Sequence, residues 1–307
     1  MDVRIENLTK RYGAQLAVDR ISFEIRSGEI VGFLGPNGAG KTTTMKMLTQ
    51  YLPPDDGRIW YGRTSYADTG IRRRIGYLPE HNPLYEDMPV IDYLGFMAAL
   101  QGVAASEIPD RIREMVRLCG LDVEKHKKIG ELSKGYRQRV GLAQAIIHNP
   151  DILILDEPTT GLDPNQIVEI RELIRKLGKE KTVILSTHIL PEVEATCDRI
   201  LIINKGRIVA DGSVAELRAQ SEGKQWLQLR IERDPAKDVI AILSSLPSVE
   251  AVRWLNGPDG PIELQSKPGM SSNRDVFHTC VDHGLVLLEM IPGETKLEDI
   301  FRDLTLN

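Results

Sequence analysis

The chain has 307 residues, of which 41% are hydrophobic and 27% charged, and its formal net charge is −5. This is the composition of a globular protein with one large domain or a large and a small one, and the negative charge gives no indication of a nucleic-acid partner. Three scattered cysteines suit a reducing compartment. No stretch resembles a signal peptide or an apolar membrane helix, so we expect a soluble, cytoplasmic chain that reaches a membrane only through another subunit.

The first two thirds of the chain predict a mostly parallel α/β layer. Residues 3–8 and 18–25 alternate apolar and polar side chains, as half-exposed antiparallel strands do. Residues 29–35, 151–156 and 181–187 are instead continuous apolar runs, as in strands buried on both faces. Residues 199–212 predict a hairpin that turns at "NKG". Helices are expected after residue 40 and over 163–178, where Asp163 caps and Pro164 begins the helix.

The last third predicts a separate, smaller α/β domain. The polar stretch 218–224 is a candidate linker, which divides the chain into domains 1–218 and 219–307. The pattern after it predicts strands at 225–232, 249–254, 261–266 and 285–290, and helices at 235–246 and 272–283. That order of elements is typical of a ferredoxin-like fold.

A phosphate-binding loop follows the first buried run. Residues 35–42, "GPNGAGKT", match G-x-x-x-x-G-K-[ST] between a strand and a helix. Backbone N–H groups of such a loop wrap phosphate oxygens, Lys41 adds a charge for the β- and γ-phosphates, and Thr42 offers a hydroxyl to Mg²⁺. The expected nucleotide-binding residues are Gly35, Pro36, Asn37, Gly38, Ala39, Gly40, Lys41, Thr42 and Thr43.

Polar residues follow two other buried runs, at the sheet edge where open α/β sheets bind ligands. Asp156 ends "ILILD" and fits the Mg²⁺-directed aspartate of a P-loop nucleotidase. Glu157 fits the base that orients or deprotonates the attacking water. His188 follows "VILST" and is expected at the γ-phosphate.

The stretch "LSKGYRQRV" at 132–140 predicts a second anion site. Ser133 is a suitable N-cap, and Lys134, Arg137 and Arg139 surround the start of the predicted helix. Cations usually suit a helix C-terminus better, so this helix start is expected to receive an anion.

The motifs over residues 1–218, and the order in which they follow one another, resemble those of the ATP-binding cassette (ABC) ATPases. Residues 35–42 match the Walker A motif and "ILILDEP" the Walker B motif. "YLPE" lies where the family has its Q-loop, "GLDP" matches the D-loop with Asp163, and His188 matches the switch histidine. Tyr12 matches the aromatic residue that stacks on adenine. The signature motif is matched by Leu132, Ser133, Lys134, Gly135 and Tyr136.

Three residues depart from the family pattern. Glu80 replaces the usual Q-loop glutamine and remains able to coordinate Mg²⁺ or its water. Lys134 and Tyr136 replace a glycine and a glutamine of the signature, while Ser133 and Gly135 keep the groups that contact phosphate. The segments "IGYLPEHNPLYEDM" and "LEDIFRDLT" look most like the gliding-motility type of export ATPase.

The resemblance implies an ATPase that uses ATP and Mg²⁺. Two copies would pack head to tail, with each ATP between the Walker A motif of one copy and the signature of the other. This homodimer would lie at the cytoplasmic face of the inner or plasma membrane and would drive export through a separate membrane permease. Two alternatives remain open: a soluble, non-transport ABC ATPase, and a regulatory ATP-binding module without turnover.

Overall fold

The computed structural model describes residues 1–220, 226–232, 237–255, 257, 260–267, 269–293 and 297–305. The chain divides into two compact units, one formed by Met1–Val214 and the other beginning at Ala215. None of the described helices is both long enough and apolar enough to span a bilayer.

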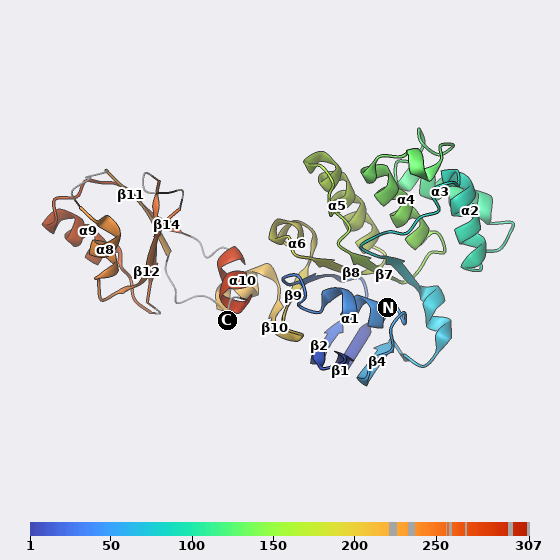
Figure 1. The fold of residues 1–307 in the computed structure, drawn as a ribbon, viewed down its shortest axis with the longest axis horizontal. Helices are drawn as coiled ribbons and strands as arrows, with labels where there is room; N and C mark the ends of the chain where they lie inside the picture. The colour runs from blue at the N-terminus through green and yellow to red at the C-terminus, as the bar shows by residue number, and fades with distance from the viewer. Residues whose placement is uncertain are drawn as a thin grey trace. The chain divides into compact units, whose positions relative to one another are not determined.

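An antiparallel sheet opens the first unit (Figure 1). In spatial order its strands are β2 (Gln15–Ile25), β1 (Val3–Tyr12), β4 (Asp56–Tyr61) and β5 (Thr64–Ser65). The first two are longer than the alternating pattern predicted, because they continue to a tight turn at Gly13, whose φ is 58°. Val3 and Ile5 of β1 are buried, and Arg4 between them is exposed, as the alternation requires.

The second sheet confirms the predicted mostly parallel layer. Its order is β10 (Arg207–Gly212), β9 (Arg199–Asn204), β3 (Ile30–Leu34), β8 (Thr182–Thr187), β7 (Ile152–Asp156) and β6 (Ile75–Leu78). Only the β9–β10 hairpin is antiparallel. The four-residue strand β6 was not predicted, since so short a run has no clear period.

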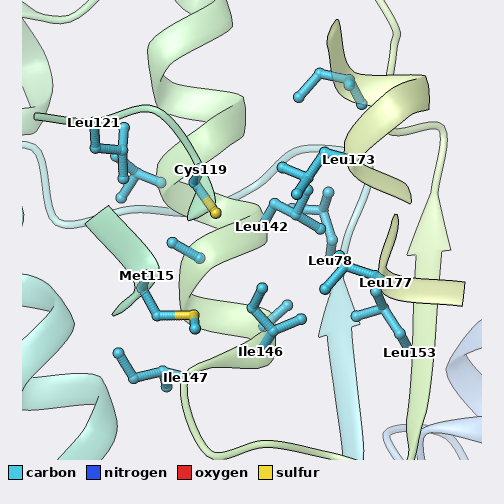
Figure 2. Packing of buried hydrophobic residues seen from close by; sticks show 14 of the residues in the cluster. Leu78, Met115, Cys119, Leu121, Leu142, Ile146, Ile147, Leu153, Leu173 and Leu177 are labelled. Atoms are coloured by element: carbon cyan, nitrogen blue, oxygen red, sulfur yellow. The ribbon is translucent and has the colours of Figure 1, made fainter. Parts of the chain in front are cut away.

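The continuous apolar runs arise because both faces of this sheet are covered. Phe33, Ile154 and Ile184 join the antiparallel sheet and the helix α1 (Lys41–Leu48) in one core. Leu153 and Leu185 point to the opposite face and join a second core, which Figure 2 shows. Alternate residues of one strand therefore belong to different cores.

Helices build that second core. They are α2 (Val90–Leu100), α3 (Ile108–Leu118), α4 (Lys134–Ile146) and α5 (Pro164–Gly178). Helix α5 matches the predicted 163–178 helix, and its stripe is buried at Ile170, Leu173, Ile174 and Leu177. Shorter elements complete the unit: η1 (Thr69–Arg74), η2 (Ile129–Glu131) and α6 (Leu190–Thr196). Helices α2 to α4 gather at one side of the sheet (Figure 1).

The second unit has the order expected for a ferredoxin-like fold. After α7 (Val214–Gln220) it contains β11 (Trp226–Ile231), α8 (Val239–Ser244), β12 (Val249–Trp254), β13 (Ile262–Ser266), α9 (Asn273–Asp282), β14 (Leu287–Gly293) and α10 (Leu297–Thr305). The strands lie in the order β12-β13-β11-β14 with antiparallel neighbours, as two interleaved βαβ units require. The predicted linker begins inside α7, and its residues 221–224 lie outside the described residues, as do 225, 235 and 236.

Candidate active site

The phosphate-binding loop joins β3 to α1 in the predicted way. Gly40 precedes the helix with φ 110°, and a Cβ at this position would lie 2.5 Å from the Ala17 carbonyl oxygen, so the turn requires glycine. Lys41 is buried, and its Nζ donates to the Gly35 carbonyl at 2.8 Å and the Pro36 carbonyl at 3.3 Å. These backbone oxygens hold the ammonium group over the loop.

Asp156 ends β7 with no exposed surface. Its Oδ1 accepts hydrogen bonds from the hydroxyls of Thr42, at 3.3 Å, and Ser186. Its Oδ2 is buried without a hydrogen-bond partner among the described residues. Burial raises the pKa of Asp156, the two hydroxyls lower it, and the carboxylates of Glu80 and Glu157 raise it further. Among the described residues, no cationic side chain forms an ion pair with this carboxylate.

This arrangement fits a small divalent cation. A hydroxyl and carboxylate oxygens are the hard ligands that Mg²⁺ prefers, and the unpartnered Asp156 oxygen gains a partner when a cation is present. Glu80 lies in the exposed turn after β6 and lines the same cavity as Thr42 and Asp156. The residues that would hold the ion are thus Thr42, Asp156 and Glu80.

Glu157 lies between two basic side chains. Its Oε2 is 2.9 Å from His188 Nδ1, and its Oε1 is 3.6 Å from Lys41 Nζ. The Thr160 hydroxyl donates to Oε2 at 3.3 Å. The backbone of Glu157 has φ 51°, which is uncommon for a residue with a side chain, and its N–H donates to the Ser186 carbonyl at 3.0 Å. The structure thus places the predicted residues Lys41, Glu157 and His188 next to one another.

Sequence reasoning missed Ser186. It pairs with Asp156 in the β7–β8 register, so its hydroxyl reaches the carboxylate from the neighbouring strand. The only signal in the sequence is a small hydroxyl residue two positions before His188. Its partner is set by which strands are adjacent, and a single sequence does not show that.

A cavity of about 490 Å³ extends from the cation ligands toward the helices. Tyr77 contributes a buried hydroxyl that has no hydrogen-bond partner in the described part of the chain, and burial raises its pKa. The lining comes from α1, the β6 strand and its following turn, α2 and α4 with the residues just after them, and the end of β7. It includes Thr42, Lys46, Tyr77, Glu80, His81, Met97, Gln101, Gln144, His148 and Asp156. The cavity therefore extends from the proposed cation ligands to the helices α2 and α4.

The structure agrees with the predicted second anion site only in part. Ser133 is the N-cap of α4, with its hydroxyl accepting from the Tyr136 N–H at 3.4 Å. Lys134 fills the space that a Cβ on Gly161 would occupy. Arg139 does not face an incoming anion, because it pairs with Glu169 and donates to the Cys119 carbonyl at 3.0 Å. The expectation that all three cations serve the helix start is therefore wrong for Arg139.

The remaining predicted residues come from other elements than the P-loop. Among the described residues, no hydrogen bond or ion pair joins residues 132–136 to residues 35–43. Tyr12 ends β1 with half of its surface exposed. Asp163 caps α5, where its Oδ1 accepts from the Gln166 N–H at 2.9 Å.

Comparisons with known proteins match this chain to ATP-binding proteins. The ABC transporter family model matches residues 18–160. The uncharacterized ABC transporter ATP-binding protein YxlF of Bacillus subtilis (strain 168) is 36% identical over 297 residues, which cover 97% of each chain. The bacitracin transport ATP-binding protein BcrA of Bacillus licheniformis is 34% identical, over 97% of this chain and 95% of its own. The dimeric, post-hydrolysis structure of an ATP-binding cassette with ADP and Pi has a TM-score of 0.64 and 26% identity, and the match covers 69% of this chain and 98% of that one.

Proposed function

This chain is an ATP-binding subunit of the ABC transporter family and hydrolyses ATP, and we propose that two copies work head to tail beneath a separate membrane permease. Hydrolysis is supported best by the position of the Glu157 carboxylate, between Lys41 and His188 and directly after the partly unsatisfied Asp156. The pairing of two copies is supported by the similar cassette whose solved structure is dimeric. Such a group can receive a proton from a water molecule while neighbouring positive charge stabilises the phosphate.

Each residue has a distinct role in this proposal. Backbone N–H groups of 35–43 wrap the ATP phosphates, and Lys41 exchanges its weak carbonyl partners for phosphate oxygens. Glu157 orients the attacking water, and His188 holds the γ-phosphate side. Tyr12 offers its exposed ring to the adenine. Thr42, Asp156 and Glu80 would hold Mg²⁺, which would supply positive charge to neutralise the phosphates.

The signature acts on the nucleotide of the second copy. In this chain residues 132–136 make no bond to the P-loop among the described residues, yet Ser133 and Gly135 begin a helix suited to an anion. A helix N-terminus contributes only about 0.3–1 kcal/mol to a nearby negative charge. That cannot hold ATP alone, but it can favour closure onto ATP already held by a complete P-loop. Loss of the γ-phosphate then favours opening.

The Glu157→Gln variant tests the dimer. It keeps the side-chain volume and removes the proton acceptor, so ATP should be bound but not hydrolysed, and the closed dimer should accumulate. Light scattering with saturating ATP and Mg²⁺ measures the mass, and phosphate release measures turnover. Lys41→Ala is the control, since it should bind no ATP and stay monomeric. A Glu157→Gln protein that remains monomeric with ATP bound would contradict the head-to-tail dimer.

The permease is proposed to dock on α2 and the turn before it, at the cytoplasmic face of the membrane. Three large apolar side chains are exposed here: Tyr85 by 56%, Phe96 by 43% and Leu100 by 67%. The rings of Tyr85 and Phe96 are tilted against each other, with centroids 5.8 Å apart. The cavity that reaches Glu80 begins beside α2, at Met97 and Gln101, so an occupant of this surface lies close to the cation ligands. The relatives named for bacitracin transport and for Nod factor export support a role in export.

Substitution of Phe96 and Leu100 by serine tests the docking surface. The pair lies one helical turn apart and is exposed, so folding and ATP hydrolysis by the isolated subunit should persist while recovery in the membrane fraction falls. Val168→Ser on α5, which removes a side chain of similar exposure at 51%, is the matched control. Undiminished membrane recovery of the Phe96/Leu100 variant would exclude this surface.

A further inference from the structure

Glu192 is a buried carboxylate to which the proposed chemistry assigns no role. It lies in the first turn of α6 with 1% of its surface exposed. Each of its oxygens accepts a hydrogen bond from a threonine: Oε1 from the Thr159 hydroxyl, and Oε2 from the Thr187 hydroxyl at 2.9 Å. No salt bridge to it occurs in the described part of the chain. Two hydroxyls alone therefore offset the cost of burying this group.

The two threonines belong to two different parts of the active site. Thr159 lies two residues after Glu157, and its carbonyl accepts from the Leu162 N–H at 3.2 Å, in the turn that leads to Asp163. Thr187 ends β8, directly before His188. Its hydroxyl also accepts from the Ile189 N–H at 3.1 Å, so both its donor and its acceptor are used. Glu192 therefore fixes the 159–162 turn against the segment that carries His188.

The same two segments are joined a second time at the reacting groups. The Glu157 N–H donates to the Ser186 carbonyl, and the Glu157 carboxylate reaches His188. A displacement of the 159–162 turn would therefore reach His188 by two routes. One runs through Thr159, Glu192 and Thr187, and the other runs through Glu157. A carboxylate suits this connection because it accepts from both hydroxyls at once, whereas a glutamine offers one acceptor and must donate with the other atom.

We propose that Glu192 is a positioning residue for ATP hydrolysis, which couples the position of the Thr159–Asp163 segment to the geometry of Glu157 and His188. The inference rests on the proposed two-copy ATPase. In that arrangement the D-loop, residues 161–164, would contact the second copy. Arrival of that copy would then be transmitted to the hydrolytic pair of this chain. Glu192 touches neither nucleotide nor water in this scheme.

Steady-state kinetics of Glu192→Gln, Thr159→Val and Thr187→Val test the proposal. Each should lower kcat by about 10- to 100-fold, as small misplacements of catalytic groups do, and leave KM for ATP within a factor of about two. Thr159→Val and Thr187→Val should be non-additive in kcat when combined, because both break one connection. Glu194→Gln is the matched control for loss of a charge from α6 and should keep the wild-type rate.

A second measurement separates this inference from the proposed function. Adding Glu192→Gln to Glu157→Gln should leave ATP-induced dimerisation intact by light scattering. If Glu157→Gln alone fails to dimerise, the proposed function is wrong. If it dimerises while Glu192→Gln and both valine variants hydrolyse ATP at the wild-type rate, the positioning role is wrong. A fall in kcat that only matches a lost folded fraction, measured by thermal unfolding, would also overturn it. The valine variants keep the shape of threonine, so they are expected to stay folded.

Discussion

Asp156 and Glu157 are neighbours in the chain with opposite surroundings. Asp156 is fully buried, its pKa is raised mainly by burial, and one of its oxygens has no hydrogen-bond partner among the described residues. Glu157 is also buried but lies close to His188, Lys41 and the Thr160 hydroxyl. The first carboxylate is therefore uncompensated without a cation, and the second is already held in place.

Asp156→Asn should stabilise the nucleotide-free protein at neutral pH while abolishing ATP hydrolysis. Asparagine keeps the acceptor for Ser186 and Thr42 and removes a buried charge, a gain on the order of 1–2 kcal/mol in the free energy of unfolding. Because the folded-state pKa of Asp156 is raised, its ionisation costs stability as pH rises through that pKa. The advantage of asparagine should therefore shrink as pH falls toward 4. Urea unfolding at both pH values measures it, and a destabilised variant at pH 7 would contradict this account.

Helix α4 is positioned by its neighbour as much as by its own cap. Ser133 provides the N-cap, while Gly135 is buried where a Cβ would lie 2.5 Å from Cδ of Gln166 on α5. Gln166 in turn completes the capping box of Asp163. The signature helix start and the D-loop thus share one contact, and Lys134 adds another against Gly161.

Gly135→Ala should cost less than about 1 kcal/mol of stability, because only the flexible end of Gln166 must move. It should nevertheless weaken ATP-induced dimerisation in the Glu157→Gln background, since the methyl group and the displaced Gln166 side chain crowd the helix start that is expected to contact the phosphate of the other copy. Gln166→Ala in the same protein removes the crowding within the chain. If that double change restores dimerisation, the effect of Gly135→Ala came from α5 and not from the second copy.

The sequence predicted the elements and residues whose signals are local. The buried strands β3, β7 and β8, the helix α5 with its Asp163 cap, and the loop around Lys41 carry their patterns within a few residues. Ser186 and Glu192 were missed because their partners come from other strands and loops. The pairing of Arg139 with Glu169 of α5 was missed for the same reason, since it joins two helices that contact only in the folded chain.

Each unit of the molecule has a core of its own. Two clusters fill the Met1–Val214 unit, one on each face of its parallel sheet, and a third cluster lies wholly within the second unit, around Leu229, Ile262 and Val276. The three tryptophans are divided between them: Trp60 lies in the first unit, and Trp226 and Trp254 lie in the second. Independent cores imply that the units can unfold independently.

Thermal unfolding followed by fluorescence should therefore show two transitions. A variant with Trp226 and Trp254 changed to phenylalanine reports the first unit, and Trp60→Phe reports the second. In the Glu157→Gln background, ATP with Mg²⁺ at a hundred times its Kd should stabilise the first transition by at least about 2.7 kcal/mol, because dimerisation adds to binding, and leave the second in place. One shared transition that moves as a whole with ATP would show that the units unfold together.

The backbone of Glu157 is left-handed, with φ 51°. A glutamate in this conformation lowers the stability of the fold, yet hydrolysis is proposed to need its carboxylate. Glycine and asparagine adopt this conformation more readily than glutamate does. A mutant library selected only for soluble expression should therefore drift toward those residues at position 157, whereas selection for transport should retain glutamate. Designers who stabilise this chain by folding energy alone would thus tend to remove the residue on which its hydrolysis is proposed to depend.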